Sequence, residues 1–246
     1  MAAHPHPSPA RSAPLAPPTV GAPAPPPVLA ACGMAFEAAL AAGPGVAAVC
    51  GPGPARLEAM LAARLGMDAA GWGGVFSFGV ACALDPGLAP GTCVLATGVR
   101  TADGFLRADP GWLRALAQRL PAAVSGALAG LDAPLLAAAD KAALWHASGA
   151  CAADMESHAA ARAARRHGLP FAACRVVLDP ARRNVPACAL AGLEADGGTA
   201  LVPLLRALAG APRQLGPLCV LACDAWRAHR ALARVRTRLG ERLALP

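Results

Sequence analysis

The sequence predicts an α/β fold: a three-layer αβα sandwich in which a mixed, mostly parallel central sheet carries helices on both faces. Short apolar runs with strand character alternate with amphipathic segments of helical character along the chain. Strands that alternate with helices pair mainly in parallel, with the helices covering both faces of the sheet. Hydrophobic residues make up 56% of the 246 residues, which is enough for a sizeable core.

The N-terminal segment differs in composition from the rest of the chain. Residues 1–27 are rich in proline and alanine, and prolines interrupt every apolar run there, so no signal peptide is expected. Such a segment cannot pack, and we expect it to be disordered. Residues 28–246 then form a single domain. No run of about 18 apolar residues is free of glycine, proline and charge, so no membrane span is expected.

The expected elements follow from apolar periodicity and from turn residues. Strands are predicted at 28–32, 46–50, 74–80, 92–97, 123–129, 150–153 and 171–178. Helices are predicted at 54–65, 110–120, 134–146 and 155–167, with two or three more at the C-terminus. Asp109 is expected to be the N-cap of the second of these helices.

Charge and cysteine usage argue against several classes of protein. The net charge is +7, but apart from Lys141 the basic residues are arginines, dispersed and not interleaved with aromatic residues, so nucleic-acid binding is not expected. The nine cysteines form no C-x-x-C pair and lie mostly in apolar runs, which indicates a reducing cytoplasm and no metal site. Gly51-x-Gly53 followed by Leu57 is an incomplete glycine signature, which disfavours a dinucleotide-binding oxidoreductase.

Several carboxylates follow predicted strands, at positions where α/β sheets bind ligands. Asp179 ends an apolar strand, where burial would raise its pKa and suit a proton donor; the alternative is a strand-end aspartate that starts a turn with Pro180. Glu156 could accept hydrogen bonds from two ribose hydroxyls, or be an ordinary glutamate at a helix N-terminus. Glu37 could activate water, or be an ordinary first-turn helical glutamate.

A phosphate nucleophile would need backbone N–H groups, an arginine and a hydroxyl instead. The candidates are Gly33, Gly53, Arg56 and Ser77. The Gly-Pro-Gly turn at 51–53 is weak evidence by itself, because such turns are common and its proline lacks an N–H.

Four motifs occur in an order that resembles a known family. They are Cys32-Gly33-Met34-Ala35-Phe36-Glu37, Ser77-Phe78-Gly79-Val80-Ala81, Asp154-Met155-Glu156-Ser157 and Arg175-Val176-Val177-Leu178-Asp179. This series resembles the nucleoside phosphorylase/nucleosidase superfamily, which includes purine nucleoside phosphorylases and methylthioadenosine/adenosylhomocysteine nucleosidases. The resemblance covers nearly all of residues 28–240 and is greatest to the hopanoid-associated phosphorylases.

The resemblance implies cleavage of the N-glycosidic bond of an adenine nucleoside: phosphorolysis of adenosylhopane, releasing adenine in hopanoid biosynthesis, with phosphate as co-substrate and no other cofactor. A hydrolytic purine nucleosidase and a non-catalytic nucleoside-binding relative are the alternatives. The resemblance assigns Asp179 to protonation of the purine at N7 and Glu37 to activation of water. The other assignments are Met155 and Glu156 to the ribose, Pro134 and Leu135 to the base, and Ser77 to the nucleophile.

Two departures from the family pattern concern the site. Leu178 stands where nucleosidases commonly have serine or asparagine, and Cys82-Ala83 stands where a Gly-Gly pair is usual. The resemblance also implies a cytoplasmic homo-oligomer. A lipid-linked nucleoside would bring it to the inner membrane, and the amphipathic stretch 214–239 is a candidate for that contact; core or subunit interface is the alternative.

Overall fold

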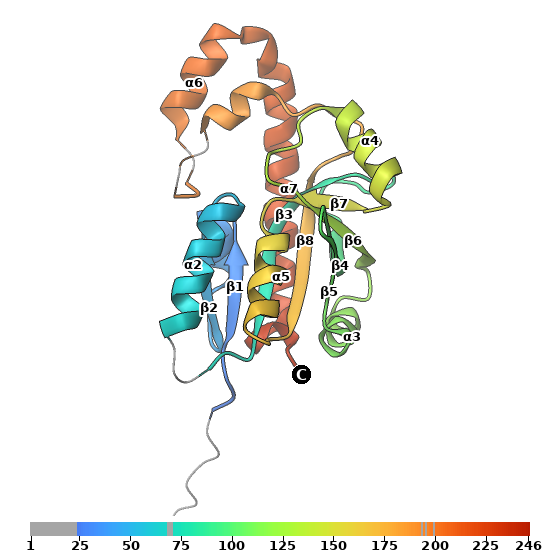
Figure 1. The fold of residues 1–246 in the computed structure, drawn as a ribbon. Coiled ribbons are helices and arrows are strands. Elements are labelled where there is room, and N and C mark those ends of the chain that lie inside the picture. Colours follow the sequence, from blue (N-terminus) through green and yellow to red (C-terminus); the bar gives the residue numbers. More distant parts are fainter. Residues whose placement is uncertain (1–23, 68–70, 193, 195, 199) are drawn as a thin grey trace, which may run out of the picture.

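The computed structural model describes residues 24–67, 71–192, 194, 196–198 and 200–246 (Figure 1). The segment expected to be disordered, 1–27, lies outside the described residues except for 24–27, which form no helix or strand. Within the described ranges, no helix is both long enough and apolar enough to span a membrane.

Strands and helices alternate over most of the described chain. The strands are β1 (Val28–Cys32), β2 (Val46–Cys50), β3 (Gly74–Ala83), β4 (Cys93–Thr101), β5 (Gly104–Arg107), β6 (Val124–Gly130), β7 (Ala152–Asp154) and β8 (Phe171–Asp179). The helices are α1 (Ala35–Ala41), α2 (Pro54–Met67), α3 (Pro110–Arg119), α4 (Ala138–Ser148), α5 (Ser157–Arg166), α6 (Leu201–Gly210) and α7 (Leu215–Leu239). Three short 3-10 helices are η1 (Ala187–Gly192), η2 (Pro212–Gln214) and η3 (Glu241–Ala244).

The strands form one mixed sheet in the order β2-β1-β3-β7-β6-β4-β5. β8 pairs with both β3 and β4, so that β3, β7, β6, β4 and β8 are hydrogen-bonded in a closed ring. The pairs β1–β2, β1–β3, β3–β8, β4–β6 and β6–β7 are parallel, and β3–β7, β4–β5 and β4–β8 are antiparallel. The predicted fold class is therefore confirmed, with the closed ring as an addition.

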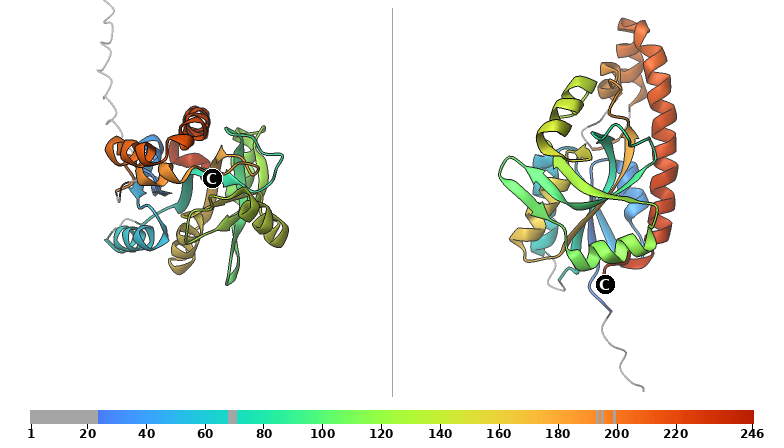
Figure 2. Two further views of the ribbon diagram at one scale, coloured as in Figure 1. Left: turned by 90° about the horizontal axis from the view of Figure 1, so that it is seen from above. Right: turned by 90° about the vertical axis from the view of Figure 1, so that its right-hand side faces the viewer.

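Helices cover the sheet from two sides. In the right-hand view of Figure 2, α7 runs along one side of the strands and α2 and α5 lie on the other. The core divides accordingly, because alternate residues of β8 point to opposite faces. Phe171, Ala173 and Val177 belong to the cluster that includes α2 and α5. Ala172 and Val176 belong to the cluster that includes α3 and α7.

Several element boundaries differ from the sequence prediction for identifiable reasons. The helix expected from 134 begins at Ala138, whose N–H donates to Asn184 Oδ1 at 2.7 Å. β3 extends to Ala83 because Cys82 and Ala83 pair with β7. β5 was not predicted, and α1, which the alternative interpretation of Glu37 as a first-turn glutamate implied, had no predicted range. The expected N-cap is confirmed, since Asp109 Oδ1 accepts from the Trp112 N–H at 2.7 Å.

The C-terminal helices contain both a core segment and an exposed one. The second half of α7 packs into the core through residues such as Leu232, which is fully buried. In contrast, α6 and the start of α7 project past the sheet (Figure 1) and none of the ten residues of α6 is buried. Leu201 and Val202, for example, are 66% and 68% exposed. The 214–239 stretch is thus core in its second half, and its first half lies next to an apolar surface.

Candidate active site

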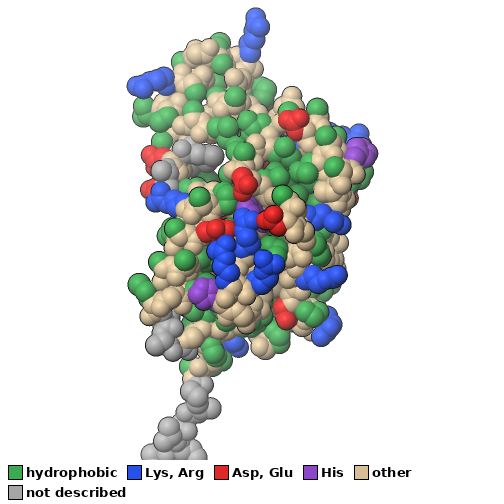
Figure 3. All heavy atoms as spheres, in the orientation of Figure 1, with side chains coloured by type: hydrophobic (Ala, Val, Ile, Leu, Met, Phe, Trp, Pro, Cys, Tyr) green, Lys and Arg blue, Asp and Glu red, His purple; other side chains and the backbone are tan. Residues whose placement is uncertain are grey.

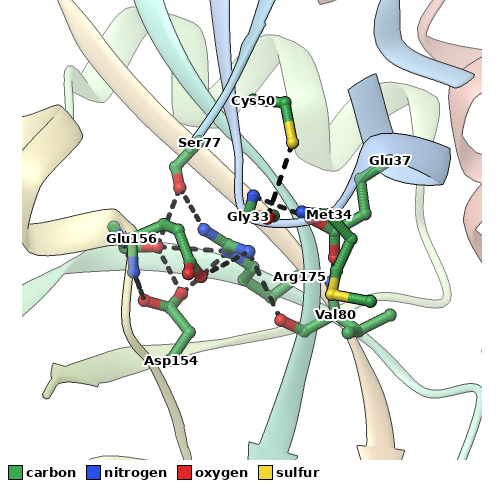
Figure 4. A network of polar contacts seen from close by, with 10 residues as sticks. Gly33, Met34, Glu37, Cys50, Ser77, Val80, Asp154, Glu156 and Arg175 are labelled. Atoms are coloured by element: carbon green, nitrogen blue, oxygen red, sulfur yellow. Dashed lines mark hydrogen bonds and ion pairs between the residues drawn. The ribbon is translucent and has the colours of Figure 1, made fainter. Parts of the chain in front are cut away.

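A buried arginine on β8 organises the centre of the candidate site (Figure 4). Arg175 is fully buried and lies opposite Gly79 of β3. Its Nε is 2.7 Å from Asp154 Oδ2, its Nη2 donates to Ser77 Oγ at 2.6 Å, and its Nη1 is 3.6 Å from Glu156 Oε2. A buried charge is tolerated only when it is paired and hydrogen-bonded, and this guanidinium meets that condition.

Glu37 lies in the first turn of α1 and is 1% exposed. Its Oε2 accepts hydrogen bonds from the N–H groups of Gly33 and Met34, both at 2.9 Å, and its Oε1 accepts from the Val80 N–H at 2.7 Å. Burial raises the pKa of Glu37, while Arg175 and the three N–H groups act in the opposite direction. Glu37 is therefore both a first-turn residue that caps its own helix and a neighbour of the arginine.

Glu156 lies in the short turn between Asp154, the last residue of β7, and Ser157, the first residue of α5. Its pKa is raised to about 7: burial is the largest cause, Arg175 acts in the opposite direction, and the nearby Asp154 and Glu37 carboxylates add to the rise. A Cβ atom at Gly33 would lie only 2.6 Å from Glu156 Oε1, so glycine is needed there for the carboxylate to reach this place. Glu156 is consequently a carboxyl group that can gain or lose a proton near neutral pH.

Ser77 supports the arginine from β3. Its Oγ is 3.0 Å from Ser157 Oγ, and Arg175 Nε also donates to Ser157 Oγ at 3.2 Å. Ser77 is fully buried, so its hydroxyl is engaged within this network. Gly79, two residues along β3, has the same close-approach role as the glycine before α1, because a Cβ there would collide with the Glu37 carboxylate and would lie 2.6 Å from Arg175 Nη1.

At the end of β8, Asp179 forms an ion pair with Lys141 of α4. Lys141 is fully buried, and its Nζ also donates to the carbonyl oxygens of Pro180 at 3.2 Å and Arg183 at 2.9 Å. Burial raises the pKa of Asp179, and the contact with Lys141 lowers it. Lys141, the only lysine in the chain, lies outside the four motifs and was not among the predicted site residues.

Met155, Gly53 and Arg56 lie at the other border of the arginine network. A Cβ on Gly53 would be 3.9 Å from Met155 Cε, and the Gly53 backbone hydrogen-bonds the Glu156 carboxylate. An open depression of about 580 Å³ adjoins this turn and is lined by Pro52, Gly53, Pro54, Ala55, Arg56, Glu58, Asp132 and Arg162. Arg56 is exposed in it. Arginine and carboxylate side chains gather on this face (Figure 3).

The two residues expected at the base differ in their surroundings. Pro134 is exposed. Leu135 is partly buried and packs against the apolar cluster that includes Leu84, with Cys82 also packed on it. Because Cys82 pairs with Asp179 across β3 and β8, this cluster lies at the strand end that carries Asp179. Leu135 is thereby placed to form an apolar wall on that side.

The arginine network and the Asp179–Lys141 pair are connected through β8, which carries both Arg175 and Asp179. Arg175 and Asp179 are four residues apart on β8, which corresponds to roughly 13 Å along a strand. The Asp179–Lys141 ion pair therefore lies at one end of this region and the carboxylates around Arg175 at the other, a separation that an elongated polar ligand can span. Among the described residues, no three histidine, cysteine, aspartate or glutamate side chains are arranged to hold a metal ion.

Comparison with protein families gives one match, to the family described as the phosphorylase superfamily, over residues 15–196. Solved structures are similar at low sequence identity. The S-adenosylhomocysteine nucleosidase of Streptococcus pyogenes shares 19% identity at a TM-score of 0.57, over 65% of this chain and 86% of that one. A futalosine hydrolase of Helicobacter pylori shares 16% at 0.55, over 62% and 88%.

The 5'-methylthioadenosine/S-adenosylhomocysteine nucleosidase of Helicobacter pylori shares 14% identity at a TM-score of 0.60, over 85% of this chain and 97% of that one. At these identities the similarity establishes the fold alone. Among curated proteins, no sequence matches this chain.

Proposed function

Since the chain belongs to the phosphorylase superfamily, we propose that it cleaves the N-glycosidic bond of a purine nucleoside, with Asp179 as the proton donor. A purine leaves poorly as an anion, so cleavage needs an acid next to its N7. Asp179 is a carboxyl group that is 7% exposed; burial raises its pKa, which favours the protonated form, and the contact with Lys141 lowers it. The apolar packing of Leu135 at the same end supports a base pocket there.

The ribose would lie between the acid and the arginine network. Glu156 can accept hydrogen bonds from two sugar hydroxyls, and Met155 precedes it in the same turn, beside Gly53. Arg175 and Gly33 hold the Glu156 carboxylate in position, the first by charge and the second by leaving room. These contacts support the ribose role for Met155 and Glu156.

The observation that carries the choice of nucleophile is the charge of the buried cluster. Arg175 is one guanidinium among three carboxylates, those of Glu37, Asp154 and Glu156. Even with Glu156 about half protonated near neutral pH, a phosphate dianion added to this cluster would meet no net positive charge, whereas water would meet a base. Burial raises the pKa of Glu37, which makes it a stronger base toward water. We therefore propose hydrolysis, with Glu37 as the base.

Phosphorolysis is the second candidate, and the depression beside Gly53 favours it. Arg56 is exposed there, on the first turn of α2 after the Gly-Pro-Gly turn, and such a helix N-terminus suits an anion. In the structure, however, the Gly33 N–H and the Ser77 hydroxyl are engaged by Glu37 and Arg175. A phosphate at this place would have to compete with those partners.

The proposed substrate class is adenine nucleosides. The structural neighbours named above include enzymes named for S-adenosylhomocysteine and 5'-methylthioadenosine, which supports adenine as the leaving group. The sequence motifs favour adenosylhopane among adenine nucleosides, because they are most like those of hopanoid-associated phosphorylases. Adenosylhopane and methylthioadenosine are the two substrates to test first.

The test measures adenine release from both nucleosides, each with and without phosphate, by the wild-type protein and by Asp179→Asn. We expect adenine release without phosphate by the wild type and its loss in the variant. Adenine release that requires phosphate would indicate phosphorolysis and contradict the proposed hydrolysis. No release from a broad nucleoside panel would refute the enzymatic proposal and favour a non-catalytic nucleoside-binding protein.

A further inference from the structure

We propose that Lys141 is the positioning residue of the acid: its ammonium group holds the Asp179 carboxyl group in place and stabilises the carboxylate that remains after the proton has passed to the leaving purine. The inference rests on the proposed function and deepens it, because it assigns a role to a residue outside the family motifs. The contact between Lys141 and Asp179, and the full burial of the lysine, are its foundation.

The local structure positions the Lys141 side chain next to Asp179. Ala138 starts α4 with its N–H on Asn184 Oδ1, and the Val185 N–H donates to the Leu136 carbonyl at 2.9 Å. These two bonds attach the start of α4 to the segment after β8. Lys141 follows one helical turn after 138, so its side chain reaches back to that segment.

All three N–H bonds of the ammonium group have acceptors. One goes to Asp179, one to the Pro180 carbonyl at 3.2 Å and one to the Arg183 carbonyl at 2.9 Å. An ammonium group has three donors and no acceptor, so this environment suits the charged form. The buried Lys141 ammonium group therefore has three hydrogen-bond acceptors, and Asp179 is the charged one among them.

The other ionisable groups near Asp179 cannot replace this cation. From α7, Asp224 raises the pKa of Asp179; it is itself paired with Arg183 and with Arg227, the latter at 3.2 Å. From β3, burial raises the pKa of Cys82 to about 12, so this thiol is neutral at physiological pH. Within the described chain, Lys141 is the cation that contacts the acid.

The sequence around Asp179 makes this partner necessary. Leu178 precedes it and packs against the apolar cluster on the α7 side, so it offers no hydrogen bond to the carboxyl group. The polar partner that Leu178 does not provide comes from α4, as the Lys141 ammonium group. Without a cation beside it, the buried carboxyl group would hold its proton more tightly and transfer it less readily to the purine.

The chemical role follows from the balance of the step. When the bond between C1' and N9 breaks, its electron pair goes to the base, and Asp179 transfers its proton to N7. The enzyme is left with a carboxylate in a buried place, which is costly without a cation. An opposite charge within about 4–6 Å favours the ionised form by one to three pKa units, so Lys141 makes Asp179 a stronger acid.

The experiment compares Lys141→Met, which removes the charge, with Lys141→Arg, which keeps it. We expect Lys141→Met to raise the pKa of Asp179 by at least about one unit in a carboxyl ¹³C NMR titration, assigned with Asp179→Asn, and Lys141→Arg to stay closer to the wild type. We expect adenine release by Lys141→Met to fall about tenfold to a hundredfold, and the limb of the pH profile that depends on protonated Asp179 to move to higher pH.

Two further readouts separate this role from a purely structural one. 4-Nitrophenolate leaves from a 4-nitrophenyl riboside without being protonated. If the wild type cleaves this substrate, we expect the cleavage rate of Lys141→Met to be less than about threefold lower. An Asp179 titration that is unchanged in a folded Lys141→Met protein would overturn the inference. Wild-type protein that releases no base would refute the proposed function instead, and the titration would still decide the inference about Lys141.

Discussion

Replacing Glu156 by glutamine should remove activity and yet make the protein more stable in mild alkali. The pKa of Glu156 rises from 4.5 to about 7, chiefly because of burial. Below pH 4.5 the group is protonated in the folded and unfolded states, so it contributes no pH-dependent difference. Between pH 4.5 and about 7 the unfolded chain loses this proton while the folded protein keeps it, so stability falls over that interval; above about pH 7 both states are ionised and the loss stays constant. A shift of about 2.5 units then costs roughly 3 kcal/mol of stability.

Glutamine has nearly the shape of glutamate and fits the space that Gly33 leaves, but it carries no such penalty. We therefore expect Glu156→Gln to match the wild type near pH 4.5 and to exceed it by up to about 3 kcal/mol at pH 8. For a chain of this size that is roughly 6–12 °C in Tm. Urea unfolding followed by tryptophan fluorescence at several pH values measures the difference.

A matched control is Glu58→Gln, since Glu58 forms an ion pair with Arg162 that is 2.9 Å long and partly exposed. Exposed pairs of this kind contribute at most about 1 kcal/mol, so we expect a small change there. A glutamine variant that is less stable than the wild type at pH 8, or a difference that does not grow between pH 4.5 and about 7, would contradict the raised pKa of Glu156.

Three further predictions concern single residues. Asp179→Asn should lower adenine release by about 10²- to 10⁴-fold while leaving the far-UV spectrum unchanged, and near-normal turnover would exclude Asp179 as the acid. Gly79→Ala should destabilise the fold by about 1–3 kcal/mol, because its methyl group would collide with the side chains of Glu37 and Arg175; full stability in urea would show that the network can shift. Asp109→Ala should cost about 1 kcal/mol of stability through loss of the α3 cap while activity stays unchanged, and a fall in activity would contradict the separation of this helix from the site.

The strands were predictable because their apolar runs are short and bounded by glycine, proline or charge. β1 and β2 have the predicted limits, and β8 extends the predicted strand by one residue, to Asp179. The direction of β7 was not predictable, since three residues carry no periodicity. It pairs antiparallel with β3, so the carboxyl-end rule for parallel strands does not by itself explain why Glu156 reaches Arg175.

No role was predicted from the sequence for Arg175 or Lys141, the two cationic residues of the candidate site. Arg175 was the single charge within an apolar strand, and such a residue must be paired if the strand is buried. That signal could have identified it as the centre of a carboxylate cluster. Lys141 lies on a helix 38 residues before Asp179, and no periodicity in the sequence reports a contact between them. Only the closure of the ring by β8, with α4 docked beside it, brings the two together.

The exposed apolar helix α6 bears on two expectations that stay predictions. All but one of its residues are apolar or glycine, the exception being Arg206, and none is buried. A second copy of the chain would account for such a surface, as would a lipid membrane. Size-exclusion chromatography with light scattering, combined with sedimentation with anionic vesicles, separates the two.

The central claim is that water attacks the sugar of a purine nucleoside at this site while Asp179 protonates the base. Mass spectrometry of the sugar product formed in ¹⁸O-labelled water, in the presence of phosphate, tests it most directly. We predict free adenine together with a reducing sugar that carries one ¹⁸O atom at C1'. A sugar 1-phosphate without the label, or no adenine at all, would contradict the claim.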